Sequence, residues 1–204
     1  RGCYSREMFS NLKISKADSF EKHLNKYNVI HINVVDFLNE SQNIDEMILE
    51  IQKSILFEII DEFSDVRFYD DKKLARSLKD VFAKHGVPFI FIIDEWDCIF
   101  REHKNDTEAQ TKYLDFLRSL LKDQSYVALA YMTGILPIKK YGKHSAINVF
   151  YEYSMTDAKP VSEFTGFTEE EVKGLCEQYG KSFEQMKQWY DGYCLDGISI
   201  YNPK

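Results

Sequence analysis

Apolar runs long enough to cross a membrane are missing from this sequence of 204 residues. The longest, residues 87–93, has seven residues, whereas a membrane-spanning helix needs about 20. The first residues also lack the charged start and apolar stretch of a signal peptide. We therefore expect no membrane partner. Because the chain starts at Arg1 rather than at Met and stops abruptly at Lys204, we also expect it to be an internal piece of a longer protein.

Closely spaced cysteines are missing as well. Cys3, Cys98, Cys176 and Cys194 lie far apart, without a C-x-x-C motif and without a histidine at the spacing of a metal site. Four cysteines allow disulfides in number, but their spacing and the lack of an export signal favour reduced thiols. The predicted location of the protein is therefore cytoplasmic.

Positive charge is in short supply. The sequence has 26 Lys and Arg against 33 Asp and Glu, a net charge of −7. Surfaces that bind nucleic acid need clustered Lys and Arg to displace counterions, and the basic residues here are scattered among acids. A dominant nucleic-acid surface is therefore disfavoured. What is present, 44% hydrophobic and 29% charged residues, is typical of a soluble globular domain.

Three apolar segments with the composition of β-strands alternate with helical patterns. The expected strands are residues 29–35, 87–93 and 126–132. The expected helices are residues 43–63, 72–85 and 108–121. Asn43 should cap the first helix together with Glu46, and Gly86 should end the second. Strands that alternate with helices predict an α/β fold with a parallel sheet.

The pattern changes after about residue 160, where two short helices follow each other without a strand between them. Thr168 with Glu171, and Ser182 with Gln185, form two capping boxes, and Gly180 should end the first of these helices. The expected parts of the chain are an α/β core, residues 1–160, and a small helical, lid-like subdomain, residues 161–204.

The most informative stretch is FIFIIDEWD, residues 89–97, in which an apolar strand ends in acidic residues. This is the Walker B pattern. A rigid strand end suits Asp94 for supporting Mg²⁺ through bound water, and Glu95 can then orient or deprotonate an attacking water. Thr133 follows the next strand and suits a γ-phosphate sensor. The plain alternative is that strands end in polar residues because the chain leaves the core there.

Several further segments carry a resemblance to a known family. They are IIDEWD at 92–97, TGILPIK at 133–139, NVFYEYSM at 148–155, FTGFTEEEV at 164–172, WYDGY at 189–193 and IYNP at 200–203. Together, and in this order, they resemble the bacterial predicted AAA-ATPase family, which are P-loop ATPases of the AAA-like and STAND-like kind. The resemblance implies an incomplete three-layer P-loop NTPase fold of the additional-strand type, with a small helical appendage.

Carried over by position, the resemblance implies a role for each polar strand end. Asp94 would bind the metal and help to bind the cofactor, Glu95 would be the catalytic base, and Thr133 would act as a catalytic sensor in contact with the nucleotide. The cofactors would be ATP and Mg²⁺, and the intact protein would be an ATP hydrolase. Members of the family often carry a C-terminal nuclease-like domain of the PD-(D/E)xK type, which these residues do not include.

The sequence departs from the family at one central point. No G-x-x-x-x-G-K-[ST] phosphate-binding loop occurs in it. In the family, an R-R-F-G-K-S-like loop should lie shortly before Arg1. We therefore expect a fragment that alone neither binds ATP tightly nor hydrolyses it. Because the strand that feeds the loop is also lacking, we expect an exposed apolar sheet edge and aggregation of the isolated chain.

Weaker signals have plainer explanations. Glu102-His103-Lys104 is an E-x-K triplet of the kind that nucleases use, but it lies in a polar stretch that indicates a solvated loop. Candidates for an arginine finger, for which surface salt bridges are the favoured explanation, are Arg76, Arg101 and Arg118.

Three further features also have plain explanations. Lys139 and Lys140 follow the sensor strand, where a phosphate contact competes with a solvated turn, the favoured explanation. Residues 189–193 are expected to form a hydrophobic plug rather than a lid over nucleotide, and His31 is expected in the core.

Two classes of function fit these residues. The first is part of an enzyme that couples ATP hydrolysis to a conformational change. The second is a nucleotide-responsive or inactive regulatory module without turnover. An intact upstream G-K-[ST] loop would favour the ATPase and a degenerate loop the module. The sequence indicates neither the nucleic-acid or protein partner nor the oligomeric state.

Overall fold

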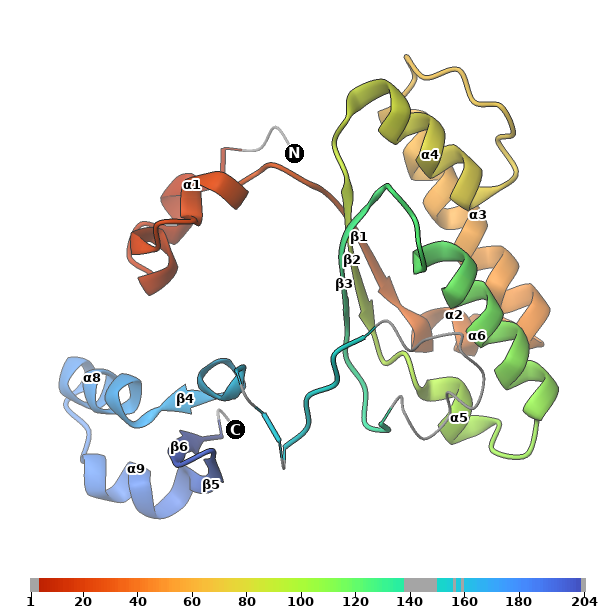
Figure 1. The fold of residues 1–204 in the computed structure, drawn as a ribbon. Coiled ribbons are helices and arrows are strands. Elements are labelled where there is room, and N and C mark those ends of the chain that lie inside the picture. Colours follow the sequence, from red (N-terminus) through yellow and green to blue (C-terminus); the bar gives the residue numbers. More distant parts are fainter. Residues whose placement is uncertain (1–3, 138–149, 156, 159, 203–204) are drawn as a thin grey trace. The chain divides into compact units, whose positions relative to one another are not determined.

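The computed structural model describes residues 4–137, 150–155, 157–158 and 160–202. The chain divides into two compact units, Arg1–Val149 and Phe150–Lys204 (Figure 1). The expected boundary at residue 160 lies within the second of these units. Among the described residues, no helix is both long and apolar enough to span a membrane.

A parallel sheet forms the centre of the first unit. Its strands, in the order β1-β2-β3, are β1 (Asn28–Asn33), β2 (Phe89–Asp94) and β3 (Val127–Met132). The register places Asn33 beside Asp94 and Ile93 beside Met132, so the carboxyl ends of the strands meet at one edge of the sheet. The predicted α/β fold with a parallel sheet is confirmed.

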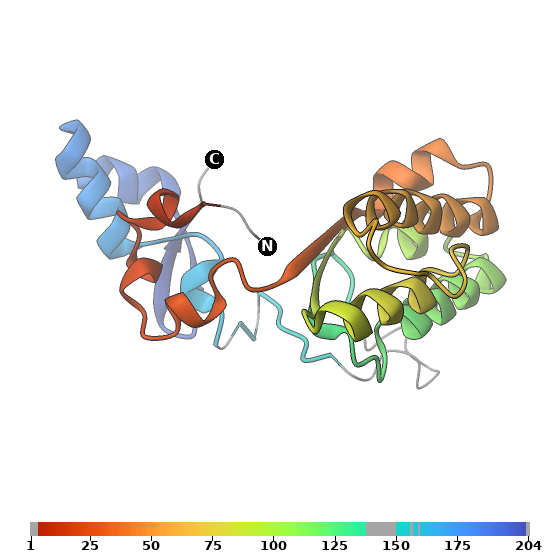
Figure 2. The same ribbon diagram turned by 90° about the horizontal axis from the view of Figure 1, so that it is seen from above.

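Helices cover one face of this sheet. They are α2 (Val34–Glu40), α3 (Ile44–Glu62), α4 (Leu74–His85), α5 (Cys98–Glu102) and α6 (Thr107–Leu121). Figures 1 and 2 show α3, α4 and α6 packed side by side on that face, where α3 contacts both of the others. Phe91 and Ile93 of β2 point into this layer and are fully buried. Short helical turns precede β1: η1 (Arg6–Phe9), η2 (Lys13–Lys16) and α1 (Phe20–His23).

The opposite face of the sheet is largely open. Val29, Leu129 and Tyr131 are 58%, 53% and 57% exposed. His31 alternates with Ile32 along β1, lies on this face and is exposed, so the prediction of a core histidine is wrong. The reason is that the helices cover only the other face. The described residues of this unit thus form two layers, and the third layer of the expected sandwich stays a prediction.

Helix boundaries follow the capping residues. Asn43 Oδ1 accepts a hydrogen bond from the Glu46 N–H at 3.0 Å, and Glu46 Oε2 accepts one from the Gln42 N–H at 2.7 Å, which confirms the predicted cap of α3. Gly86 ends α4 in the left-handed conformation, also as predicted. The predicted strand 29–35 is wrong at its end, because Val34 starts α2 and is buried there. Tertiary packing overrides its β-branched preference.

The second unit combines helices with a small antiparallel sheet. Its elements are η3 (Ser162–Phe164), β4 (Phe167–Thr168), α8 (Glu169–Tyr179), α9 (Phe183–Tyr190), β5 (Asp191–Leu195) and β6 (Ile198–Tyr201), with strand order β4-β6-β5. Both predicted helices and the capping box of Thr168 with Glu171 are confirmed. The sheet was not predicted. Asp196 and Gly197, both with positive φ, turn β5 into β6.

Candidate functional site

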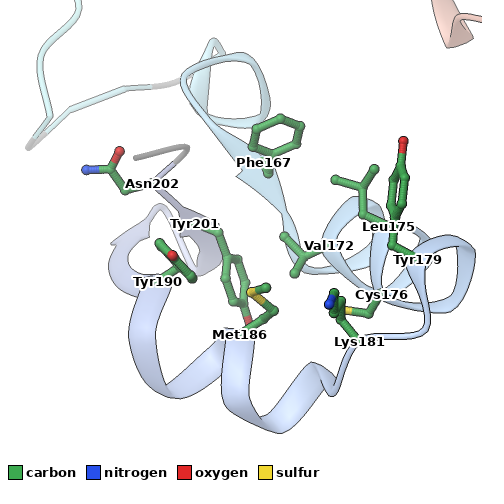
Figure 3. A pocket seen from close by; sticks show the side chains of 10 residues that line it. All are labelled: Phe167, Val172, Leu175, Cys176, Tyr179, Lys181, Met186, Tyr190, Tyr201 and Asn202. Atoms are coloured by element: carbon green, nitrogen blue, oxygen red, sulfur yellow. The ribbon is translucent and has the colours of Figure 1, made fainter.

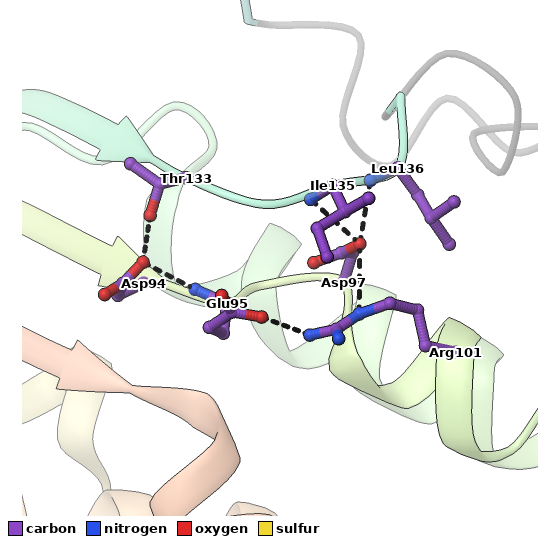
Figure 4. A network of polar contacts seen from close by, with 7 residues as sticks. All are labelled: Asp94, Glu95, Asp97, Arg101, Thr133, Ile135 and Leu136. Carbon is purple, nitrogen blue, oxygen red and sulfur yellow. Dashed lines mark hydrogen bonds and ion pairs between the residues drawn. The ribbon is translucent and has the colours of Figure 1, made fainter. Parts of the chain in front are cut away.

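A polar network occupies the carboxyl ends of β2 and β3 (Figure 4). Asp94 is the last residue of β2, and Thr133 directly follows β3. The Thr133 hydroxyl donates a hydrogen bond to Asp94 Oδ1, and the Glu95 N–H donates to the same oxygen at 2.9 Å. The Thr133 N–H donates to the Ile93 carbonyl at 2.9 Å. The carboxylate of Asp94 is thus fixed through one oxygen, while Oδ2 takes part in neither bond.

Glu95 leaves the strand in an unusual backbone conformation. Its φ of 53° lies in the left-handed region, where side chains with a Cβ are disfavoured. Its side chain is 38% exposed and forms an ion pair through Oε2 with Arg101 of α5, which is 26% exposed. The partial burial of both groups reduces solvent screening of this pair. Glu95 is therefore held beside Asp94 but turned toward α5.

Asp97 is completely buried and connects two loops. Its Oδ2 accepts hydrogen bonds from the N–H groups of Ile135 at 3.1 Å and Leu136 at 2.8 Å, both in the segment after β3. The same oxygen lies 3.4 Å from Arg101 Nε. One carboxylate thereby ties the segment that follows Thr133 to the arginine that holds Glu95.

Gly134 fits where no larger residue would. A Cβ at this position would lie 2.6 Å from Asp97 Oδ1 and 2.7 Å from Trp96 Cδ1, closer than real contacts allow. The indole of Trp96 is 4% exposed, and the Trp96 N–H donates to the Thr133 carbonyl at 3.1 Å. A glycine is therefore needed for the segment after β3 to approach the segment after β2.

A cavity of about 330 Å³ adjoins Glu95. It is lined by α2 and α5, including Asn33, Leu38, Cys98 and Arg101. The side-chain oxygen of Asn33 is buried and has no hydrogen-bond partner in the described part of the chain. Burial raises the pKa of the Cys98 thiol to about 11, so this thiol is neutral at physiological pH and is no nucleophile. The carboxylates that line this cavity are Glu95 and Glu102.

The donor set of this site suits one class of metal. Among the described residues, no group of three His, Cys, Asp or Glu side chains forms a closed metal cluster. Mg²⁺ keeps several waters and binds through one or two carboxylates together with phosphates. Asp94, whose Oδ2 lies outside its two hydrogen bonds, fits such an open site.

The other candidate arginines lie apart from the network. Arg76 pairs with Asp80 at 3.1 Å and Arg118 with Asp115 at 2.9 Å, as expected of surface salt bridges. Arg101 differs, since its partly buried side chain pairs with Glu95 rather than with a surface acid.

Other candidates are exposed or cannot be placed. The residues of the E-x-K triplet, Glu102 to Lys104, are exposed where α5 ends. Lys139 and Lys140 lie outside the described residues, as do Asn148 and Val149 of the family motif. Trp189 is 80% exposed, and the hydrophobic plug expected of residues 189–193 stays a prediction.

Sequence reasoning gave no role to Asp97 and Gly134, and for Arg101 it favoured a surface salt bridge over a contact within the site. A signal for two of them existed, because Asp97 and Arg101 are four residues apart, the spacing at which opposite charges meet on a helix. Nothing in the local sequence shows that Arg101 also reaches Glu95, or that Gly134 packs against Trp96.

Comparisons with known proteins agree with this geometry. Residues 3–143 match the model of a protein family described as predicted AAA-ATPase. Over 137 residues the chain is 26% identical to an uncharacterized protein in the vnfD 5' region of Azotobacter chroococcum mcd 1. The match covers 64% of this chain and 26% of that relative, so the chain spans about a quarter of the relative's length.

Proposed function

Because the chain belongs to the predicted AAA-ATPase family, we propose that it carries the metal-holding and water-activating half of an ATPase active site. The observation that supports this most directly is the hydrogen bond between Asp94 and Thr133, with Glu95 as the next residue. An acidic pair at the end of one strand and a hydroxyl at the end of its neighbour are the groups that Mg²⁺-dependent phosphoryl transfer needs.

Asp94 is proposed to hold Mg²⁺, most directly through water. Its Oδ1 is occupied by the Thr133 hydroxyl and the Glu95 N–H, which fix the carboxylate and leave Oδ2 to face the ion's hydration shell. When bound, Mg²⁺ neutralises charge on the phosphate oxygens of ATP.

Glu95 is proposed as the general base. Its ion pair with Arg101 uses Oε2, so Oε1 remains to accept a hydrogen bond from an attacking water. An ionised carboxylate is the form that can accept a proton. The ion pair with Arg101 orients this proposed base.

Thr133 is proposed as the sensor of the γ-phosphate. In the present structure its hydroxyl donates to Asp94. A hydroxyl can rotate about its C–O bond, so the same group can donate instead to a phosphate oxygen placed between the strands. The hydrogen bonds from Ile135 and Leu136 to Asp97 hold the following segment and limit the movement of Thr133.

The proposed activity needs a phosphate-binding loop, and no such loop occurs among these 204 residues. We propose that the loop belongs to a longer protein of which this chain is a part, and that the chain alone neither binds ATP tightly nor turns it over. Backbone N–H groups and a lysine of that loop would supply positive charge to the phosphates, whereas Arg101 is paired with Glu95.

The test is ATP turnover by protein that includes both this chain and its phosphate loop. The variant is Glu95→Gln, and the control is Glu108→Gln, which alters an 80% exposed glutamate on α6. We expect Glu95→Gln to lower kcat by about 10²–10⁴-fold with nucleotide binding retained, because loss of a general base costs that much. The control should keep its turnover.

Two results would count against the enzyme. Protein with an intact loop that binds nucleotide without turnover would support a regulatory module instead. Equal turnover of the Glu95 and Glu108 variants would remove Glu95 from the chemistry.

A further inference from the structure

A cavity of about 390 Å³ lies within the second unit, between α8, α9 and β6. Figure 3 shows Val172, Met186 and Tyr201 gathered between the two helices, with Cys176 and Lys181 beside them. No residue with a role in the proposed ATPase site lines it. The cavity is therefore a candidate site of its own.

The size of the cavity suits a small molecule. Its volume of about 390 Å³ falls within the range of roughly 300–1,000 Å³ that ligand sites occupy. One water takes about 30 Å³ in the liquid, so a volume of about 390 Å³ corresponds to about 13 water-sized groups. A ligand of roughly a dozen non-hydrogen atoms would fill it.

The lining of the cavity is mostly apolar. Most of the ten lining residues are aliphatic, aromatic or sulfur-containing, and Lys181 is the one charged residue among them. It sits in the turn after Gly180, where its N–H donates to the Cys176 carbonyl at 2.9 Å. An apolar lining with one fixed cationic residue favours a ligand that is apolar except for an anionic end.

The ammonium of Lys181 is available for such a ligand. Within the described part of the chain it forms neither an ion pair nor a hydrogen bond, whereas Lys173 and Lys187 of the same unit both pair with Glu169. The neighbouring lysines are thus neutralised by an acid and Lys181 is not. No acidic residue lines the cavity to compete for it.

Tyr201 adds no negative charge to the cavity. Its side chain is 1% exposed, and its hydroxyl donates to Glu169 Oε2 at 3.5 Å. Burial, with the nearby acids Asp191 and Glu169, raises the pKa of this phenol to about 12, so it stays neutral at physiological pH. An anion bound beside Lys181 would meet no like charge from the phenol.

We propose that this cavity binds a small amphiphilic carboxylate, with its apolar body against Val172, Met186 and Tyr201 and its carboxylate paired with Lys181. The binding needs no nucleotide and no phosphate loop, so it can be tested on the chain of 204 residues. Failure of the ATPase assignment would leave it unaffected.

The test uses 4-phenylbutyrate, whose apolar body and negative charge match the lining of the cavity. The alkylation of cysteines by iodoacetamide is measured by peptide mapping. Cys176 lines the cavity and is 5% exposed, while Cys194 is exposed and does not line it, so Cys194 serves as the internal reference. We expect 4-phenylbutyrate to slow alkylation of Cys176 saturably and to leave Cys194 unchanged. The neutral 4-phenylbutan-1-ol should protect less, and 4-phenylbutylamine least.

Two matched variants test the role of the charge. Lys181→Gln should weaken the binding of 4-phenylbutyrate about threefold to tenfold, because one solvent-exposed ion pair that is partly shielded by the ligand is lost. Binding of the alcohol should not change. Lys187→Gln removes an equal charge from the same unit outside the cavity and should have no effect. Val172→Phe should fill the cavity and abolish protection by all three probes.

Three results would overturn the proposal. They are the absence of saturable protection by 4-phenylbutyrate, equal affinity for the acid, the alcohol and the amine, and equal effects of the Lys181 and Lys187 substitutions. If Val172→Phe does not fold, the two lysine variants still decide, because both alter exposed side chains.

Discussion

Asp97 places groups that belong to two different loops. Its buried carboxylate accepts the N–H groups of Ile135 and Leu136 and faces Arg101, which in turn holds Glu95. A buried carboxylate without such partners would be strongly disfavoured. The contacts around Asp97 therefore stabilise the chain and orient the proposed base through the same set of atoms.

The tightest contact around Asp97 gives the first prediction. Gly134→Ala should destabilise the first unit by about 1–3 kcal/mol, because the added methyl group overlaps Asp97 Oδ1 and the Trp96 indole. Denaturant unfolding would measure the loss. Gly174→Ala in α8 is the matched control, since nothing lies within 4 Å of the added Cβ. The control should stabilise the second unit by about 0.5–1 kcal/mol. Equal unfolding midpoints for the unsubstituted chain and Gly134→Ala would contradict the close packing of Gly134 against Asp97 and Trp96.

At the scale of elements, the start of α3 offers a clean measurement. Asn43→Ala removes the acceptor of the Glu46 N–H and should lower the free energy of unfolding by about 1 kcal/mol. Gln42→Ala is the control, because Gln42 contributes its backbone N–H rather than its side chain to the cap. Thermal or denaturant unfolding of the two variants would check this. A loss of equal size in both would show that Asn43 does not act as the cap.

Elements with strong local signals could be predicted from the sequence. Strand β2 is an uninterrupted apolar run, and α3 and α8 begin with capping residues whose side chains bond to the backbone of the same turn. Asp94 and Thr133 could be expected near each other because the carboxyl ends of neighbouring parallel strands share one edge. All of these follow from interactions between residues close in sequence or from the rules of sheet geometry.

What could not be predicted depends on packing between distant residues. The helical start at Val34 is decided by burial against the core and not by its β-branched side chain. The ion pair between Arg101 and Glu95 needs the left-handed turn at Glu95, which no local preference favours. The hairpin at Asp196 and Gly197 is a different case, since an Asp-Gly pair between apolar residues is a local hairpin signal.

At the scale of the whole molecule, the open face of the sheet has a consequence for solution behaviour. Val29 of β1, and Leu129 and Tyr131 of β3, flank the central strand β2 on the same face of the sheet and are each more than half exposed. Apolar side chains that share one exposed sheet face form a contiguous patch, and such patches mark surfaces that associate. We expect the chain of 204 residues to self-associate as its concentration rises.

The double substitution Leu129→Lys and Tyr131→Lys should suppress this self-association with little change in the unfolding temperature, because both side chains are exposed in the folded chain. The control is Phe57→Lys, which alters a 79% exposed side chain on α3 rather than on the open face of the sheet. Sedimentation velocity over a range of concentrations would distinguish the variants. A native chain that stays monomeric throughout would show that the open face does not drive association.

The left-handed turn at Glu95 bears on how the chain would evolve in the laboratory. A residue with a Cβ costs about 1–2 kcal/mol in this conformation, while glycine adopts it freely. A library selected only for yield or heat resistance should therefore tend to replace this glutamate with glycine, and so discard the carboxylate while the fold survives. Directed evolution without a screen for activity would then produce a more stable protein that has lost the proposed catalytic carboxylate.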